Sequence, residues 1–305
     1  MMRKLPVAIC GLLLLASCGR ATSPAALTEQ EALSAEASLV ALESAVNGSA
    51  DQLRAVEQLQ YLGFQSRIQT CMQAQGFSYT PPPPPRGTLG WITKPFAGGF
   101  DALAPADDGV TRGGMFTADW RWEQTVLELA EQDSIPNPGF TSLTSDEDRD
   151  AYTDVGDACG GTSAPPVDTP SNPDALEAVY GFFGEIENDD RVTSLMKGYP
   201  DCMSGNGFDV TNRQEVRDLL DALYMDPETG FGYPLDDIER VDAARLTQVR
   251  AAEADADCRS DAHAVALALF AERYDQFIAE FGSHVDEQAS AWDAIVEQRD
   301  QLTGS

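Results

Sequence analysis

The sequence of 305 residues predicts an all-α protein made of two related helical halves, each closed by its own disulfide. Almost every periodic stretch repeats its apolar residues at steps of three and four, which is helical spacing. No clear run shows the period-two alternation of strands. The motif Cys-Met-x-x-x-Gly-Phe occurs at 71–77 and again at 202–208, and each copy is followed by a later cysteine, Cys159 or Cys258. Two copies of this length indicate an internal duplication.

The N-terminus has the layout of an export signal. Arg3 and Lys4 give it positive charge, and an apolar run follows from 5 to 16. A membrane span needs about 20 apolar residues, so this run is too short to be one. A basic start, a short apolar middle and small residues at the end are typical of a signal peptide.

The apolar run ends in the sequence Leu-Ala-Ser-Cys at 15–18, which resembles the lipobox of bacterial lipoproteins. In that family the cysteine carries the lipid and becomes the new N-terminus. The resemblance implies a signal peptide at 1–17, lipidation of Cys18 and a short polar tether at 18–27. It also implies a chain held at the cell membrane by its lipid, facing the extracellular or periplasmic side. The alternative is an ordinary signal peptide that is cut near a chance cysteine.

The first half is predicted to span 28–159. A capping box at Thr28 predicts a helix start, and the Asn-Gly pair at 47–48 predicts its end. A second capping box at Ser49 opens another helix, whose apolar stripe leads to Cys71. A further capped helix is expected to end at Cys159.

The repeated motif has a physical interpretation at the end of a helix. Its cysteine and methionine lie in the last turns, its glycine supplies the left-handed stop, and its phenylalanine folds back onto the helix. Four cysteines allow three pairings. A duplicated unit would carry its own bridge, so the pairs Cys71–Cys159 and Cys202–Cys258 are predicted. Motif pairs of this kind are also loosely similar to those of uncharacterised exported lipoproteins of actinomycete type, which implies no particular activity.

The first half contains an insertion, because its two cysteines lie farther apart than those of the second. We place this long irregular loop at 78–119, where five consecutive prolines and many glycines occur. Six aromatic residues in or just after the loop form a candidate binding surface: Trp91, Phe96, Phe100, Phe116, Trp120 and Trp122. The alternative, and the favoured one for a loop with this many aromatic side chains, is that they pack over the core.

The residues at 160–172 read as a linker, and the second half is predicted at 173–305. Pro173 suits the first position of a helix. From Asp236 the pattern is helical almost to the end, and Gly282 with Ser283 offers the one break. A periodic stretch this long predicts either a long C-terminal helix or a helical hairpin. A bend or hairpin is expected at Gly282, because a helix of about 65 residues would reach about 100 Å from a small domain.

The sequence shows little that points to catalysis. With 20 basic and 50 acidic residues the net charge is -30, so nucleic acid is not expected as a partner. None of the familiar hydrolase, metalloprotease or nucleotide-binding motifs occurs, so no catalytic residue and no cofactor is predicted. His263 with Asp257 and Asp261 could join a metal site, but a solvated acidic helix face is the better interpretation, and no metal is predicted.

Two functional hypotheses remain. The first is a non-enzymatic lipoprotein of the cell envelope that binds a ligand or a protein partner, using the aromatic loop or the long C-terminal arm. The second is an envelope hydrolase that acts on cell-wall polymer with an acid such as Glu123, beside Trp120 and Trp122. The first is favoured because a hydrolase more often shows a recognisable catalytic set.

Overall fold

The computed structural model describes residues 26–83, 101–104, 137–161, 167–224 and 238–304. Within these ranges the regular structure is helical and no strand occurs, which confirms the predicted fold class. The helices are α1 (Glu29–Asn47), α2 (Ala50–Ala74), α4 (Pro138–Thr141), α5 (Asp146–Gly160), α6 (Pro173–Glu187), α7 (Asp190–Met196), α8 (Tyr199–Gly205), α9 (Arg213–Tyr224) and α10 (Ile238–Thr303).

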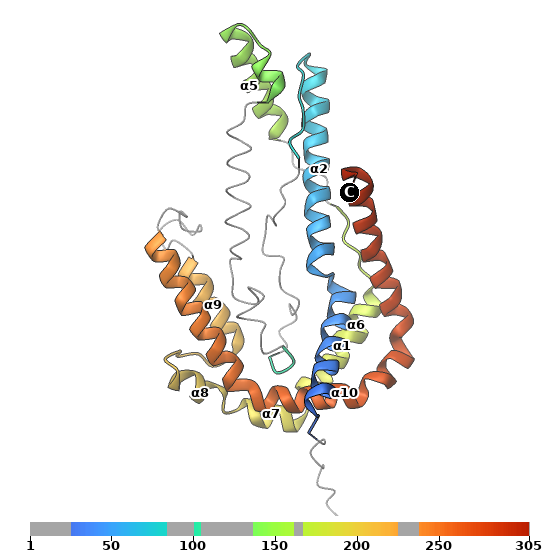
Figure 1. The fold of residues 1–305 in the computed structure, drawn as a ribbon, viewed down its shortest axis with the longest axis vertical. Coiled ribbons are helices and arrows are strands. Elements are labelled where there is room, and N and C mark those ends of the chain that lie inside the picture. Colours follow the sequence, from blue (N-terminus) through green and yellow to red (C-terminus); the bar gives the residue numbers. More distant parts are fainter. Residues whose placement is uncertain (1–25, 84–100, 105–136, 162–166, 225–237, 305) are drawn as a thin grey trace, which may run out of the picture.

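Helix α10 organises the whole chain. It runs for 66 residues without interruption, so the helix and not the hairpin is formed, and Gly282 lies inside it. Figure 1 shows α10 curving from one arm of an arch, through the base, into the other arm. It packs against α1, α2, α6, α7, α8 and α9 in turn. Helices from both predicted halves therefore pack on this one curved helix.

The helix starts follow the predicted capping signals. The Thr28 amide donates to Glu31 Oε2 at 2.8 Å, and the Ser49 amide donates to Gln52 Oε1 at 2.7 Å. Asn172 caps α6 through its side chain, with Pro173 at the first helical position. These cap bonds satisfy backbone amides at the helix starts that have no partner inside the helix, so the local sequence determines where the helices begin.

In the part of the chain that the structure describes, apolar burial divides into three clusters along the arch. The largest joins α1, α6 and α10, where Leu39, Phe183 and Phe270 have no exposed surface. In that cluster the rings of Phe182 and Phe277 stack with centroids 4.5 Å apart. The two smaller clusters surround the two disulfides, one between α2 and α5 and the other among α8, α9 and α10.

The four cysteines pair as predicted. Cys71 bonds to Cys159, which joins α2 to α5, and Cys202 bonds to Cys258, which joins α8 to α10. The two copies of the repeated motif also end their helices in the same way. The amide of the motif phenylalanine donates to the methionine carbonyl at 3.0 Å in both copies. The motif glycines, at 76 and 207, have φ of 87° and 90°. The local structures match, while the duplication itself stays a prediction.

Gly48 makes a tight contact between the α1–α2 turn and α10. Its φ is 85°, and a Cβ built on it would lie 3.1 Å from the Trp292 ring.

Gly48→Ala should therefore lower the free energy of unfolding by about 1–3 kcal/mol, since an alanine is strained at this φ and must displace the indole. Gly63→Ala is the matched control, because nothing lies within 4 Å of its Cβ position inside α2. That change should stabilise by about 0.5–1 kcal/mol. Urea unfolding of both variants measures the difference, and equal values would contradict it.

Candidate functional site

The predicted aromatic surface lies outside the described residues. This holds for Trp91, Phe96, Phe100, Phe116, Trp120 and Trp122, as well as for Cys18 and Glu123. Of the predicted insertion at 78–119, the structure describes its first residues up to 83 and the four residues 101–104. This four-residue segment, Asp-Ala-Leu-Ala, lies on the inner side of the arch (Figure 1).

The segment 101–104 is enclosed by protein. The side chains of Ala102, Leu103 and Ala104 have no exposed surface and belong to the largest apolar cluster. Polar side chains from four helices, α6, α8, α9 and α10, gather around the segment. We call this set the cradle, and it consists of Glu187, Tyr199, Arg213, Asp255, Arg259 and His263.

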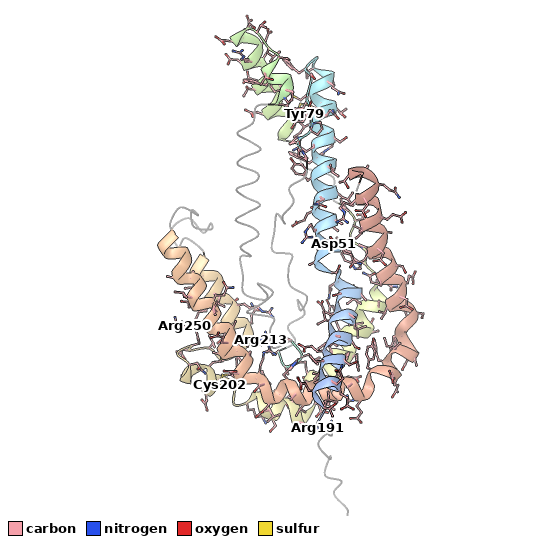
Figure 2. All side chains as sticks on the ribbon, viewed as in Figure 1. Asp51, Tyr79, Arg191, Cys202, Arg213 and Arg250 are labelled. Carbon is pink, nitrogen blue, oxygen red and sulfur yellow. A yellow bond between two sulfur atoms is a disulfide. The ribbon has the colours of Figure 1, made fainter. Side chains whose placement is uncertain are left out.

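Four cradle residues hydrogen-bond to the main chain of the segment. Glu187, the last residue of α6, accepts the Leu103 amide at 2.7 Å. The three bonds to segment carbonyls come from α9 and α10: Arg213 Nη1 to Asp101 at 3.4 Å, His263 Nδ1 to Ala102 at 2.8 Å, and Arg259 Nη1 to Ala104. A carbonyl only accepts, so the neutral His263 ring carries its proton on Nδ1. Figure 2 shows Arg213 on the inner side of the arch.

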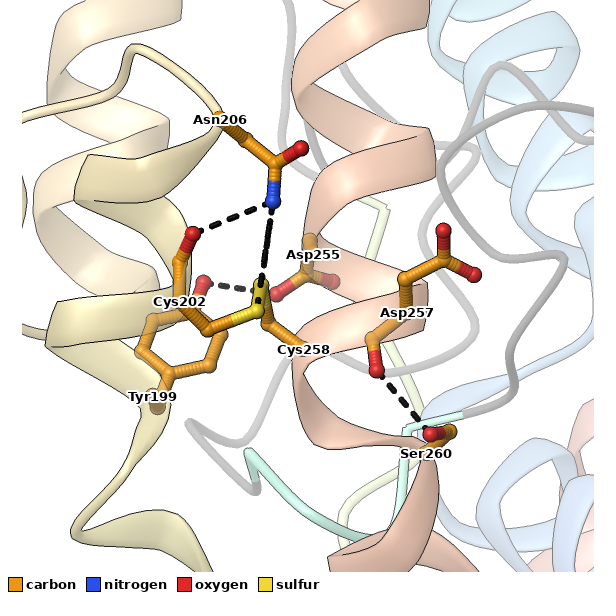
Figure 3. The surroundings of a disulfide bond; sticks show 7 residues. All are labelled: Tyr199, Cys202, Asn206, Asp255, Asp257, Cys258 and Ser260. Carbon is orange, nitrogen blue, oxygen red and sulfur yellow. Dashed lines mark hydrogen bonds between the residues drawn. A yellow bond between two sulfur atoms is a disulfide. The ribbon is translucent and has the colours of Figure 1, made fainter.

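Asp255 links three other cradle residues, because its carboxylate binds Arg213, Arg259 and Tyr199. Its carboxylate accepts from Arg213 Nε at 3.0 and 3.1 Å and from Arg259 Nε at 3.0 Å. It also accepts from the Tyr199 hydroxyl at 2.8 Å, the bond drawn in Figure 3. Arg213, Asp255 and Arg259 are 0, 2 and 1% exposed. Charged groups this deeply buried are stable only when they are paired, and here one carboxylate pairs with two guanidiniums.

The geometry shifts the pKa values of several cradle groups. Burial alone would raise the pKa of Asp255, but Arg213 and Arg259 hold the pKa of that carboxyl below its usual range. Burial, followed by the charge of Asp255, raises the pKa of the Tyr199 phenol, which therefore stays a hydrogen-bond donor. Burial also raises the pKa of Glu187, although its bond to the Leu103 amide acts in the opposite direction.

Local sequence explains how the cradle residues come together. Asp255, Arg259 and His263 are spaced by four, which places them on one face of α10. Arg213 and Tyr199 are the first residues of α9 and α8. The disulfide at Cys258 fixes α8 beside this face of α10, as Figure 3 shows.

His263 provides a pH-dependent part of the stability. Burial, followed by the charge of Arg259, lowers its pKa from 6.5 to about 4. The unfolded chain takes up this proton near pH 6.5 and the folded chain only near pH 4. The stabilisation is therefore complete above pH 6.5 and is lost as the pH falls towards 4.

His263→Gln should remove that pH dependence. Between pH 7 and pH 4 the stability difference between wild type and variant should shrink by about 1–3 kcal/mol. The raised pKa values of Glu187 and Asp101 act in the opposite sense, but they contribute to both chains and cancel in the difference. Urea unfolding at several pH values measures it, with His284→Gln on the same helix as control. A difference that does not vary with pH would contradict the prediction.

The structure does not bring His263 together with Asp257 and Asp261 in a metal site. Both aspartates are exposed, while His263 bonds to the Ala102 carbonyl. In the described part of the chain, no group of three or more histidine, cysteine, aspartate or glutamate side chains is placed to hold a metal ion.

A second feature is a groove of about 690 Å³ between α6 and α10. Its floor includes the rings of Phe182 and Phe277, and its rim is mainly acidic, with Glu177 and Glu185 on α6 and Glu280 on α10. The two rings are only 7 and 6% exposed, so little of either ring is accessible from the groove. The cradle is the better candidate site.

Sequence reasoning did not find the cradle. The spacing of Asp255, Arg259 and His263 by four is visible in the sequence, but it equally predicts an exposed ion-paired helix face. Comparison with protein-family models, curated proteins and solved structures finds no match. Among the helices that the structure describes, none has the length and apolar character to cross a membrane. Function must therefore be argued from the chemistry of the chain.

Proposed function

We propose that this chain is an exported, lipid-anchored module of the cell envelope that binds a ligand or protein partner and does not act as an enzyme. The observation that carries the binding role is the cradle, which holds four residues of an aromatic-rich stretch by their main-chain atoms. Burial of a charged side chain costs free energy, and here the buried charged side chains hold residues 101–104 in place.

Two features support the location. The sequence at 15–18 resembles a lipobox, with a basic and apolar stretch before it. The two disulfides fit an oxidising compartment outside the cytoplasm, where such bonds persist. Because Cys18 would carry the lipid, Cys18→Ala should release the chain from the membrane fraction, whereas Cys10→Ala, inside the signal, should leave it attached. A Cys18→Ala chain that remained on membranes would contradict the anchor.

The segment in the cradle supports binding at the inner side of the arch. It lies in the middle of the stretch that contains Trp91 to Trp122, and Phe100 immediately precedes it in sequence. Aromatic side chains on a loop that is anchored to a rigid scaffold are a common arrangement for recognition. The scaffold here is α6, α9 and α10.

A thermal-shift screen of the mature chain against wall sugars, peptides and divalent cations tests the binding role. A ligand present at 100 times its dissociation constant should stabilise the fold by about 2.7 kcal/mol. Trp91→Ala should remove that shift, while Leu33→Ala, at an exposed position on α1, should leave it unchanged. Turnover of a wall polymer that Glu123→Gln abolishes would instead favour the hydrolase and overturn the proposal.

A further inference from the structure

We infer that the groove between α6 and α10 is a docking site for an amphipathic helix of a partner protein, with lysine or arginine on both sides of its contact face. The inference rests on the proposed binding role, and it adds a second surface and a class of partner. The cradle is not involved, because residues 101–104 of the chain itself lie in it.

The two walls of the groove have the same helical spacing. On α6 the lining residues start at Asp174 and follow at steps of three, one, three, one and three, ending at Glu185. On α10 the same steps lead from Arg273 to His284. Each wall is therefore one face of a helix, about 16 Å or three turns long.

The walls run antiparallel. At one end Arg273 lies 3.5 Å from Asp189, which follows α6. In the middle the rings of Phe182 and Phe277 stack. At the other end Asp174 and His284 line a shared hollow. Two helices packed in this way leave a trough into which the side chains of a third helix of about three turns can interdigitate.

The charge on the rim determines which helix fits. Glu177, Glu185 and Glu280 are exposed, and their carboxylates make no hydrogen bond or ion pair with the residues that the structure describes. Arg273 also lines the groove, but its guanidinium pairs with Asp189. A complementary helix therefore carries cations beside its contact face. The net charge of -30 disfavours a nucleic acid, an anionic lipid surface or a second copy of the chain.

The floor leaves space for such a helix to approach. Ala178 and Gly181 are the small residues of the α6 wall, and a Cβ built on Gly181 would meet nothing within 4 Å. Phe281 is partly exposed and offers an apolar contact, while little of the two stacked rings is accessible. Charge therefore supplies much of the affinity, and binding should depend on salt.

The probe is a fluorescein-labelled peptide of about 15 residues, about four turns, held helical by a hydrocarbon staple. Lysines lie on both sides of a face made of leucine and alanine, and fluorescence polarisation measures its binding to the mature chain. Binding should weaken when NaCl is raised from about 0.1 to about 1 M, because the Debye length falls from about 10 to about 3 Å. A stapled peptide of the same composition in scrambled order lacks the apolar face and should bind at least about tenfold more weakly. Equal binding of the two peptides would mean that charge alone is recognised, and the inference would be wrong.

Charge-removing variants place the site. One triple variant neutralises the rim: Glu177→Gln, Glu185→Gln and Glu280→Gln. The control neutralises an exposed stretch of α10 outside the groove: Glu253→Gln, Asp257→Asn and Asp261→Asn. The rim variant should bind the peptide at least about tenfold more weakly than wild type, and the control should bind as wild type does. The changed side chains are exposed, so both chains should fold, and equal affinities for the two would overturn the inference.

A variant that fills the groove tests its shape without a change of charge. Gly181→Gln should bind the peptide at least about tenfold more weakly, because its side chain projects into the space that the helix needs. Gly184→Gln on α6 is the matched control, since Gly184 does not line the groove and nothing lies within 4 Å of its Cβ position. It should bind as wild type does. Equal binding by the two folded variants would contradict a helix seated in the groove.

Two further outcomes are distinguished. Sedimentation of the chain alone should show a monomer, and a dimer that the rim variant dissociates would make a second copy the occupant and overturn the inference. A ligand shift in the thermal screen, together with no binding of the helical peptide, would keep the proposed binding role and remove the groove as a site.

Discussion

Asp255→Asn is expected to lower the free energy of unfolding by about 3–5 kcal/mol. The carboxylate is 2% exposed and pairs with two guanidiniums, Arg213 and Arg259, that are themselves almost fully enclosed. An asparagine keeps the volume and the oxygen that accepts from Tyr199, but it removes the charge. Two buried cations then lose the carboxylate that pairs with both of them, which is the costly way to break a buried ion pair.

Asp257→Asn is the matched control for this change. It lies two residues away on α10, is exposed, and makes its described hydrogen bond with Ser260 through its main-chain carbonyl. Its effect should stay within about 0.5 kcal/mol. Urea unfolding, with the midpoint and the slope analysed separately, measures both variants. An Asp255→Asn chain that unfolds within 1 kcal/mol of Asp257→Asn would show that the two arginines find other partners.

Removal of the Cys202–Cys258 disulfide by a double change to serine is expected to cost about 4 kcal/mol. The bond closes a loop with a sequence separation of 56 residues, and the unfolded chain gains most of the conformational freedom that is released. A local effect adds to this one, because Cys258 stands beside Arg259 and Cys202 is three residues from Tyr199. Without the bond, α8 is free to move from α10 and the Tyr199–Asp255 contact weakens.

The other disulfide provides the control. Cys71–Cys159 closes a longer loop, with a separation of 88 residues, and should cost at least as much, about 4–5 kcal/mol. It lies at the α2–α5 end of the arch, away from the cradle (Figure 1). Thermal unfolding should therefore show losses of similar size for both double variants. The NMR signals of the His263 ring should move only when Cys202 and Cys258 are replaced. A similar movement in both variants would contradict the local effect.

Much of the architecture was predictable because its signals are local. Capping boxes fix where α1 and α2 begin, and the motif Gly-Phe pairs fix where α2 and α8 end. The cysteine pairing followed from the repeat of that motif. For the helix ends, a few neighbouring residues determine the structure, so distant contacts need not be known.

Features that depend on distant contacts were not predictable in the same way. Gly282 was a reasonable place for α10 to turn, but a helical glycine costs only about 1 kcal/mol, and burial of Phe277 and Val285 on either side outweighs it. The cradle is a second example. Arg213 and Arg259 have the sequence character of exposed residues, and only the approach of α9, α10 and the segment 101–104 encloses them.

The contact of α1 and α2 with the end of α10 determines when the protein can finish folding. The Val46 carbonyl accepts from Gln288 and Trp292, and Asp51 pairs with Arg299. These partners lie 242, 246 and 248 residues apart along the chain. During synthesis the N-terminal helices emerge first, and the contacts of the α1–α2 turn with α10 form only when almost the last residue has followed. The chain is therefore vulnerable to aggregation before its final helix is complete, and loss of a short C-terminal piece would remove these contacts from the α1–α2 turn.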